Sequence, residues 1–255
     1  MTKYLNYSEL PSLFNNENLD ESEKLAIKVA YLFMKDNFLK GSLVDAYSLY
    51  INNLVFGKDK NFNTARKTKD LDFSIYSRDN IDEHLDNWIQ KNNFTLIKKR
   101  YTKNNNIKVR IQVPNKDNKQ DFLNIDIMFN PDMRQQAVAS YNLILKDKLN
   151  LKLRLMDRRL KDLIDVLLGF RNFYPSGITK AEILEMIDDA YTLESSVSKQ
   201  NFETCMQQAN SFEPKSINGI SIQEYVSEFF SMLEGLTDTD LRASARFIDG
   251  YWEQS

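Results

Sequence analysis

Residues 66–76 read RKTKDLDFSIY, and this stretch contains the pattern that decides the fold. Successive side chains of a strand point to opposite faces, so Asp70 and Asp72 share one face while Leu71 and Phe73 take the other. Two carboxylates on one face repel each other unless a cation lies between them. The stretch therefore predicts a strand with an apolar face in a core and an acidic face that is either a metal site or a solvent-exposed strand end.

The segments around this strand predict an α/β domain. Three more strands are expected after it, separated by the turn-rich sequences TKNNN and PNKDNKQ. Apolar residues at helical spacing predict helices before and after the Asp70 strand in the sequence. The expected elements, in chain order, are a helix at 21–37, a short strand at 38–42, a helix at 43–56, a strand at 69–76, a helix at 80–92, and strands at 94–101, 107–113 and 122–129.

The rest of the chain has a helical pattern from about residue 143. The sequence PSG at 175–177 is the best candidate boundary, because it breaks this pattern. Helices are expected beyond it near 178–192, 198–209, 221–234 and 238–250. The predicted organisation is an α/β domain over 1–175 followed by an all-helical domain over 176–255.

Charge is distributed unevenly along the chain. Residues 180–255 contain 5 Lys and Arg against 14 Asp and Glu, although the whole chain has a net charge of only −2. The two parts are therefore expected to present surfaces of opposite sign. The single cysteine, Cys205, excludes a disulfide framework, and no apolar run is long enough to span a bilayer. We expect a cytoplasmic protein with no membrane partner.

The residue types that are scarce narrow the possible chemistry. His84 is the only histidine, which excludes histidine-rich metal sites. The seven glycines form neither G-x-G-x-x-G nor a P-loop. Phosphate chemistry would then depend on carboxylate-bound metal, on Lys and Arg, and on helix N-termini. Gly41 and Ser42, at a predicted strand-to-helix junction, are candidates for such a phosphate site.

Asp126 adds a third acid to this picture. It stands at the centre of the apolar strand FLNIDIMF, between Ile125 and Ile127. Burying an unpaired carboxylate costs several kcal/mol, so a partner or a metal is expected. Asp70, Asp72 and Asp126 together make a plausible oxygen-ligand site for Mg²⁺ or Mn²⁺, with the phosphates of a nucleotide as further ligands.

These residues resemble a known family. KGSLVDAYSLY, ARKTKDLDF and NIDI follow the nucleotidyltransferase order of Gly-Ser, D-x-D and a third acid. The wide gap before Asp70, with Arg66 and Thr68 preceding it, is similar to the AbiEii-type toxins of abortive-infection and toxin–antitoxin systems. KDKL at 146–149 and RRLKDLIDV at 158–166 resemble the third and fourth motifs of that branch. The resemblance covers about residues 24–172, and Ser42 replaces the second motif glycine.

The resemblance implies a nucleotidyltransferase fold with a mixed sheet, and a role for each matched residue. Gly41, Ser42, Arg66 and Lys148 would bind the phosphates of an NTP co-substrate. Asp70, Asp72 and Asp126 would bind the metal, with Asp126 alternatively serving as the base. Asp162 would be a further catalytic acid, as would Asp165, although Arg158–Asp162 and Lys161–Asp165 also have the spacing of ordinary helix salt bridges.

Three functions remain open from the sequence. The first is a toxin that transfers a nucleotide from an NTP to an RNA, typically tRNA, or to a protein, and that has a cognate antitoxin as partner. Basic stretches at 98–103, 108–110 and 146–161 are candidate RNA contacts. The second is a small-molecule nucleotidyltransferase of the antibiotic-modifying type. The third is a non-catalytic binding protein that keeps the fold.

Overall fold

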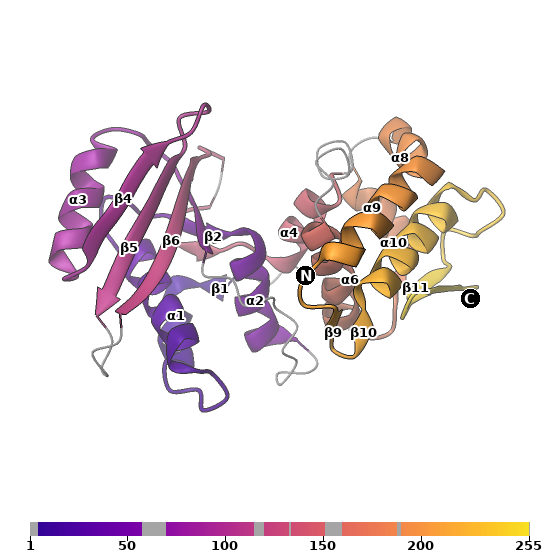
Figure 1. Cartoon of the computed structure of the whole chain (residues 1–255), viewed down its shortest axis with the longest axis horizontal. Helices are drawn as coiled ribbons and strands as arrows, with labels where there is room; N and C mark the ends of the chain where they lie inside the picture. Colours follow the sequence, from indigo (N-terminus) through magenta and orange to yellow (C-terminus); the bar gives the residue numbers. More distant parts are fainter. Residues whose placement is uncertain are drawn as a thin grey trace. The chain divides into compact units, whose positions relative to one another are not determined.

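The computed structural model describes residues 5–57, 70–114, 120–132, 134–150, 160–187 and 190–254 (Figure 1). The chain divides into two compact units, which are described separately. The first unit comprises residues 1–52 and 65–140, and the second comprises residues 53–64 and 141–255. The sequence placed the boundary at 175, whereas the structure divides the units between Ser140 and Tyr141.

The first unit is built on one seven-stranded mixed sheet of order β1-β7-β2-β3-β6-β5-β4. Strand β3 runs parallel to β6 and antiparallel to β2, and β6-β5-β4 form an antiparallel meander. The mixed sheet expected from the sequence is therefore present. The elements of the first unit are β1 (Leu5–Asn6), the 3₁₀ helix η1 (Tyr7–Leu13), α1 (Glu21–Met34), β2 (Ser42–Val44), α2 (Asp45–Phe56, whose end belongs to the second unit), β3 (Asp70–Ile75), α3 (Ile81–Lys91), β4 (Thr95–Tyr101), β5 (Ile107–Pro114), β6 (Gln120–Phe129) and β7 (Ala137–Val138).

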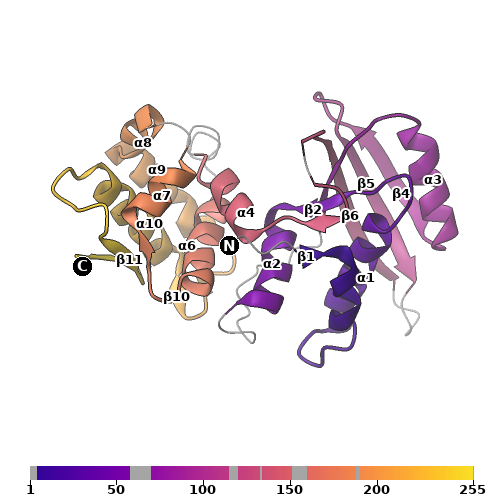
Figure 2. The same ribbon diagram turned by 180° about the vertical axis from the view of Figure 1, so that it is seen from behind.

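Helices α1 and α3 cover one face of this sheet (Figure 2). Phe33 of α1 is fully buried, stacks on Phe73 of β3 at 4.0 Å between ring centroids, and meets Trp88 of α3 edge-on at 5.2 Å. The Trp88 indole N–H donates to the carbonyl oxygen of Leu32, so the ring's polar atom has a partner inside the core. Aromatic packing of this kind fixes both helices against the sheet.

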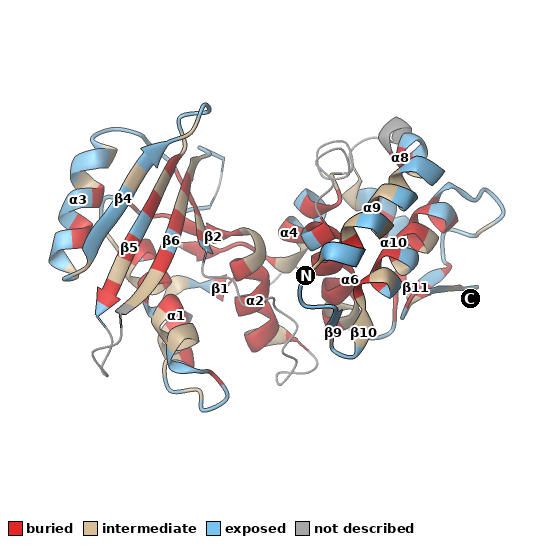
Figure 3. Ribbon diagram, in the orientation of Figure 1, coloured by how far each residue is buried: buried red, intermediate tan, exposed pale blue. Residues whose placement is uncertain are grey.

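The two faces of the sheet differ sharply in polarity. Along β5, buried Ile107, Val109, Ile111 and Val113 alternate with more exposed residues, as Figure 3 shows. Residues of β3 and β6 alternate in the same phase, with Leu71, Phe73, Ile125 and Ile127 on the helix-covered face. The period-2 pattern read from the sequence is thus confirmed, and the acids lie on the face opposite the core.

The second unit is mainly helical, and its described residues form an apolar cluster. Helix α6 contributes Leu163, Ile164 and Leu167 to this cluster, and α10 contributes Tyr225 and Phe229. None of the described helices is long and apolar enough to cross a membrane. The elements of this unit are α4 (Tyr141–Lys148), α6 (Leu160–Phe173), β8 (Ile178–Thr179), α7 (Lys180–Met186), α8 (Ala190–Ser196), α9 (Lys199–Ser211), β9 (Ser216–Ile217), β10 (Ile220–Ser221), α10 (Ile222–Thr237), β11 (Arg246–Ile248) and β12 (Tyr251–Glu253).

The prediction of an all-helical C-terminal domain is wrong in its last segment. Instead of a helix at 238–250, the chain forms a hairpin in which Ile248 pairs with Tyr251. Asp249 and Gly250 make the two-residue turn, with φ of 47° and 95°. Positive φ at both positions is the signature of a type I′ turn, for which Asp-Gly is a preferred sequence. The Asp-Gly pair was therefore the signal that helical periodicity obscured.

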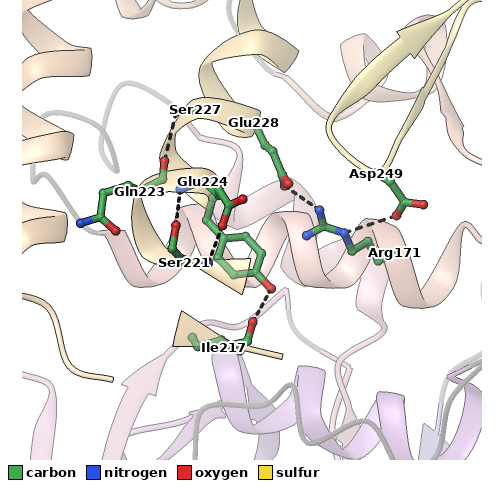
Figure 4. A network of polar contacts seen from close by, with 9 residues as sticks. Arg171, Ile217, Ser221, Gln223, Glu224, Ser227, Glu228 and Asp249 are labelled. Atoms are coloured by element: carbon green, nitrogen blue, oxygen red, sulfur yellow. Dashed lines mark hydrogen bonds and ion pairs between the residues drawn. The ribbon is translucent and has the colours of Figure 1, made fainter. Parts of the chain in front are cut away.

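An ion-pair network in the second unit connects α6, α10 and this hairpin (Figure 4). The guanidinium of Arg171 donates to the Glu228 carboxylate at 2.6 Å and lies 3.4 Å from that of Asp249. Burial raises the pKa of Glu228, and the Arg171 charge opposes that effect. At Gly250, a Cβ atom would lie 2.7 Å from Glu228 Cγ, so a glycine is needed both for the turn and for this close approach.

We predict that Arg171→Met lowers the free energy of unfolding by about 1–3 kcal/mol, because it leaves the half-buried Glu228 carboxylate without its cation. Lys199→Met is the matched control, since its pair with Glu203 is 3.5 Å long and largely solvent-exposed. Urea unfolding measures both variants. Equal effects of the two substitutions would contradict the structural role of the network.

Candidate functional site

The acidic residues of β3 and β6 meet on the open face of the sheet. The parallel register places Asp72 directly opposite Asp126, and Asp70 opposite Asn124. Neighbouring strands lie about 4.8 Å apart, so side chains opposite each other are in contact range. The three acids expected from the sequence are thus brought together on one face, and Asp72 and Asp126 form its central acidic pair.

Asp72 carries the strongest electrostatic signal of this group. Burial, followed by the charges of Asp45, Asp126 and Asp70, raises its pKa from 3.8 to about 7, and Lys108 partly opposes the shift. A carboxyl group surrounded by other carboxylates is stabilised by protonation or by a cation. The site is therefore receptive to positive charge at Asp72.

The other two acids have protein partners. Lys108 of β5, opposite Asp126 in the register, donates from its ammonium group to the Asp126 carboxylate. The side-chain amide of Asn124 donates to Asp70 at 2.8 Å. Among the residues that the structure describes, no three acidic, histidine or cysteine side chains converge as a preformed metal site. A divalent ion at the acidic pair would therefore compete with Lys108 for the Asp126 carboxylate.

The donor set still fits one type of metal site. Mg²⁺ is commonly held by only one or two carboxylates, with waters and substrate phosphates completing its coordination. Asp72 and Asp126 match that requirement because both offer carboxylate oxygens on the open face. The raised pKa of Asp72 shows that Lys108 offsets only part of the repulsion from the neighbouring acids, so a metal ion would stabilise the ionised carboxylate. The arrangement does not fit an all-protein cage.

Gly41 and Ser42 are not placed as the sequence suggested. Residues 37–39 form a turn rather than a strand, and β2 begins at Ser42, so the strand-to-helix junction lies at Val44 and Asp45. Ser42 is 1% exposed, and its hydroxyl donates to the carbonyl oxygen of Arg134. At Gly41, a Cβ atom would lie 2.6 Å from the Phe33 ring. The glycine is explained by close packing against Phe33.

Lys148 and Asp162 are buried within the second unit. The Lys148 ammonium lies 2.8 Å from Asp162 and 3.0 Å from Asp165, and the exposed fractions of these side chains are 1%, 2% and 7%. A buried cation between two carboxylates holds α4 to α6. Arg66, Thr68 and Arg158, and most of the basic stretch 146–161, lie outside the described residues.

Asp45 is a site residue that sequence reasoning missed. It is the first residue of α2, directly after Val44, whose register partner on β3 is Asp72. Its φ of 57° is a left-handed conformation, which Asp tolerates better than most residues. The available signal was an acid at the start of a predicted helix, but only the β2–β3 pairing shows that it lies near Asp72.

A row of cations borders the acids on the same open face. Lys98 and Arg100 of β4 lie opposite Arg110 and Lys108 of β5, respectively, and we call these four residues the basic sheet face. An open groove of about 350 Å³ is lined by this face together with Asp70, Asn124, Asp126 and Val109. The groove therefore extends from the acidic residues of β3 and β6 to the basic residues of β5 and β4.

Comparison with models of known protein families and with curated proteins found no match for this chain. Functional inference therefore depends on the site itself.

We predict that Asp72→Asn stabilises the metal-free protein at pH 8 but not at pH 4. The pKa of Asp72 is about 7 in the folded protein against 3.8 for an ordinary Asp, so the native state binds the extra proton between these values. The free energy of unfolding of the wild type therefore falls as pH rises through this window. The asparagine variant does not lose this stability, so above pH 7 its free energy of unfolding should exceed that of the wild type by roughly 1–3 kcal/mol. Urea unfolding in EDTA at pH 4 and pH 8 measures the stability of both proteins. An equal stability difference between variant and wild type at the two pH values would contradict the proposed repulsion among the carboxylates.

We also predict that Gly41→Ala acts on stability. The new methyl group meets a Phe33 ring that is fixed between Phe73 and Trp88, so unfolding should become easier by about 1–3 kcal/mol. Thermal unfolding measures this loss. A Gly41→Ala protein with wild-type stability and abolished nucleotide binding would instead restore the phosphate-binding role expected from the sequence.

Proposed function

We propose that this protein is a metal-dependent nucleotidyltransferase that moves a nucleoside monophosphate from an NTP to an acceptor hydroxyl. The observation that carries the proposal is the in-register pairing of Asp72 with Asp126 on the open face of the sheet, with Asp70 beside them. Acids held together at an energetic cost, on a face that does not build the core, indicate a functional site. The sequence resemblance points to the same residues.

In this proposal each side chain has a distinct task. Asp72 and Asp126, with Asp70 beside them, would hold Mg²⁺ or Mn²⁺, which supplies charge neutralisation for a triphosphate. The acceptor oxygen attacks the α-phosphorus in line, the bond to the leaving pyrophosphate breaks, and the acceptor's proton passes to the oxygen of the Asp126 carboxylate that does not hold the metal. Lys108, released from Asp126, neutralises charge on the phosphates.

Lys148 and Asp162 are left out of this catalytic group. The Lys148 ammonium contacts both Asp162 and Asp165 inside the second unit, and an ammonium that is only 1% exposed does not contact a substrate. Gly41 and Ser42 are also omitted, because both are buried and the Ser42 hydroxyl donates to the carbonyl oxygen of Arg134.

A second candidate, a binding protein without catalysis, is favoured by one observation. Lys108 neutralises Asp126 in place of a metal ion, and the described acids do not converge as a closed ligand set. Such a protein would bind an anionic partner on the open face and leave every NTP unchanged.

Incubation of the full-length protein with each α-labelled NTP, Mg²⁺ and total RNA, followed by a denaturing gel, tests the proposal. We expect a labelled RNA or a labelled protein, with transfer lowered at least a hundredfold, on the order of 3 kcal/mol, in both Asp72→Asn and Asp126→Asn. Asp132→Asn is the matched control, since Asp132 is exposed just beyond β6.

Two results would contradict the proposal. Absence of transfer from all four NTPs to RNA, to protein and to small hydroxyl compounds would favour the binding protein. Wild-type transfer by Asp72→Asn would show that the acidic pair has no part in the reaction.

A further inference from the structure

The basic sheet face holds like charges next to each other. In the antiparallel register Lys98 is directly opposite Arg110, and Arg100 is directly opposite Lys108. Residues opposite each other share a face, and like charges in that position destabilise a sheet. Two such pairs in succession are a cost that the fold itself does not require.

Most of these charges have no carboxylate partner in the part of the chain that the structure describes. Among the described residues, no ion pair involves Lys98, Arg100 or Arg110, and only Lys108 reaches an acid, Asp126. Lys99, on the opposite side of β4, is by contrast neutralised twice, by Asp82 at 2.5 Å and by Asp86 at 3.1 Å. Of three successive basic residues of β4, Lys99 is thus neutralised by acids on one face, whereas Lys98 and Arg100 stand on the other face without an ion pair to a described residue.

The shape of the groove suits an extended anion. Basic residues two apart along a strand are separated by about 7 Å, so the four cations form two short rows along β4 and β5. The Arg110 guanidinium lies over the Phe122 ring at 5.0 Å, which adds an aromatic surface at the same face. Open basic grooves that combine cations with aromatic rings bind single-stranded nucleic acid through its backbone and bases.

We propose that Lys98, Arg100, Lys108 and Arg110 bind the phosphate backbone of a single-stranded nucleic acid, and that the strand leads across β5 toward Asp126. The like-charge pairs are then relieved when phosphates lie between them. This inference rests on the proposed function only where it makes the bound nucleic acid the acceptor of the transferred nucleotide. Binding of the nucleic acid itself requires neither NTP nor transfer.

The test uses the full-length protein and a fluorescent single-stranded RNA oligonucleotide, without NTP, with binding followed by anisotropy. Lys98→Gln with Arg110→Gln should weaken binding about tenfold or more and lower the slope of log affinity against log salt by roughly 1.5. Lys99→Gln with Lys103→Gln, which removes the same charge from the same segment, should change affinity less than about twofold. Thermal unfolding separates binding from folding, and the first double variant should be no less stable than the wild type because it relieves repulsion.

Three results would overturn the inference: no binding of the oligonucleotide by the wild type, equal losses in both double variants, or loss of NTP binding with RNA binding intact. The last would assign the face to a triphosphate. Asp72→Asn should keep wild-type RNA affinity, so failure of the proposed transfer and failure of strand binding are distinguishable.

Discussion

The parallel pairing of β3 with β6 is the constraint on which the rest of the first unit depends. Its register is fixed by the core, because Leu71 and Phe73 must lie beside Ile125 and Ile127 on the helix-covered face. A slip of one residue would turn every side chain of a strand to the other face and bury the acids. The hydrophobic core therefore enforces the contact between Asp72 and Asp126, although that contact is itself repulsive.

This constraint also organises charge across the sheet. Acids lie on β3 and β6, bases lie on β4 and β5, and the Lys108–Asp126 ion pair is the point where the two sets meet. A cation or phosphate that binds there exchanges one set of partners for another without disturbing the apolar face. The proposed function uses this arrangement to bind an anionic ligand together with its counter-cation.

The sequence predicted the features that follow from local periodicity. Strand alternation placed Asp70 and Asp72 on one polar face, and the structure agrees. Asp126, expected as a buried acid that needs a partner, is half-buried on that same face and is paired with Lys108. Roles that depend on long-range contacts were not accessible: the packing of Gly41 against Phe33, the proximity of Asp45 to Asp72, and the burial of Lys148 with Asp162. The basic run at 98–100 shows the same limit, because only the pairing of β4 with β5 separates Lys99 from its neighbours.

The most direct test of the central claim is to locate a metal ion. Crystals of the full chain grown with Mn²⁺ and a non-hydrolysable NTP analogue would reveal the ion by its anomalous scattering. Our account predicts a peak shared by the carboxylates of Asp72 and Asp126, with Lys108 moved from Asp126 to a phosphate. A nucleotide bound elsewhere, or no ion at this position with Lys108 still paired to Asp126, would contradict it.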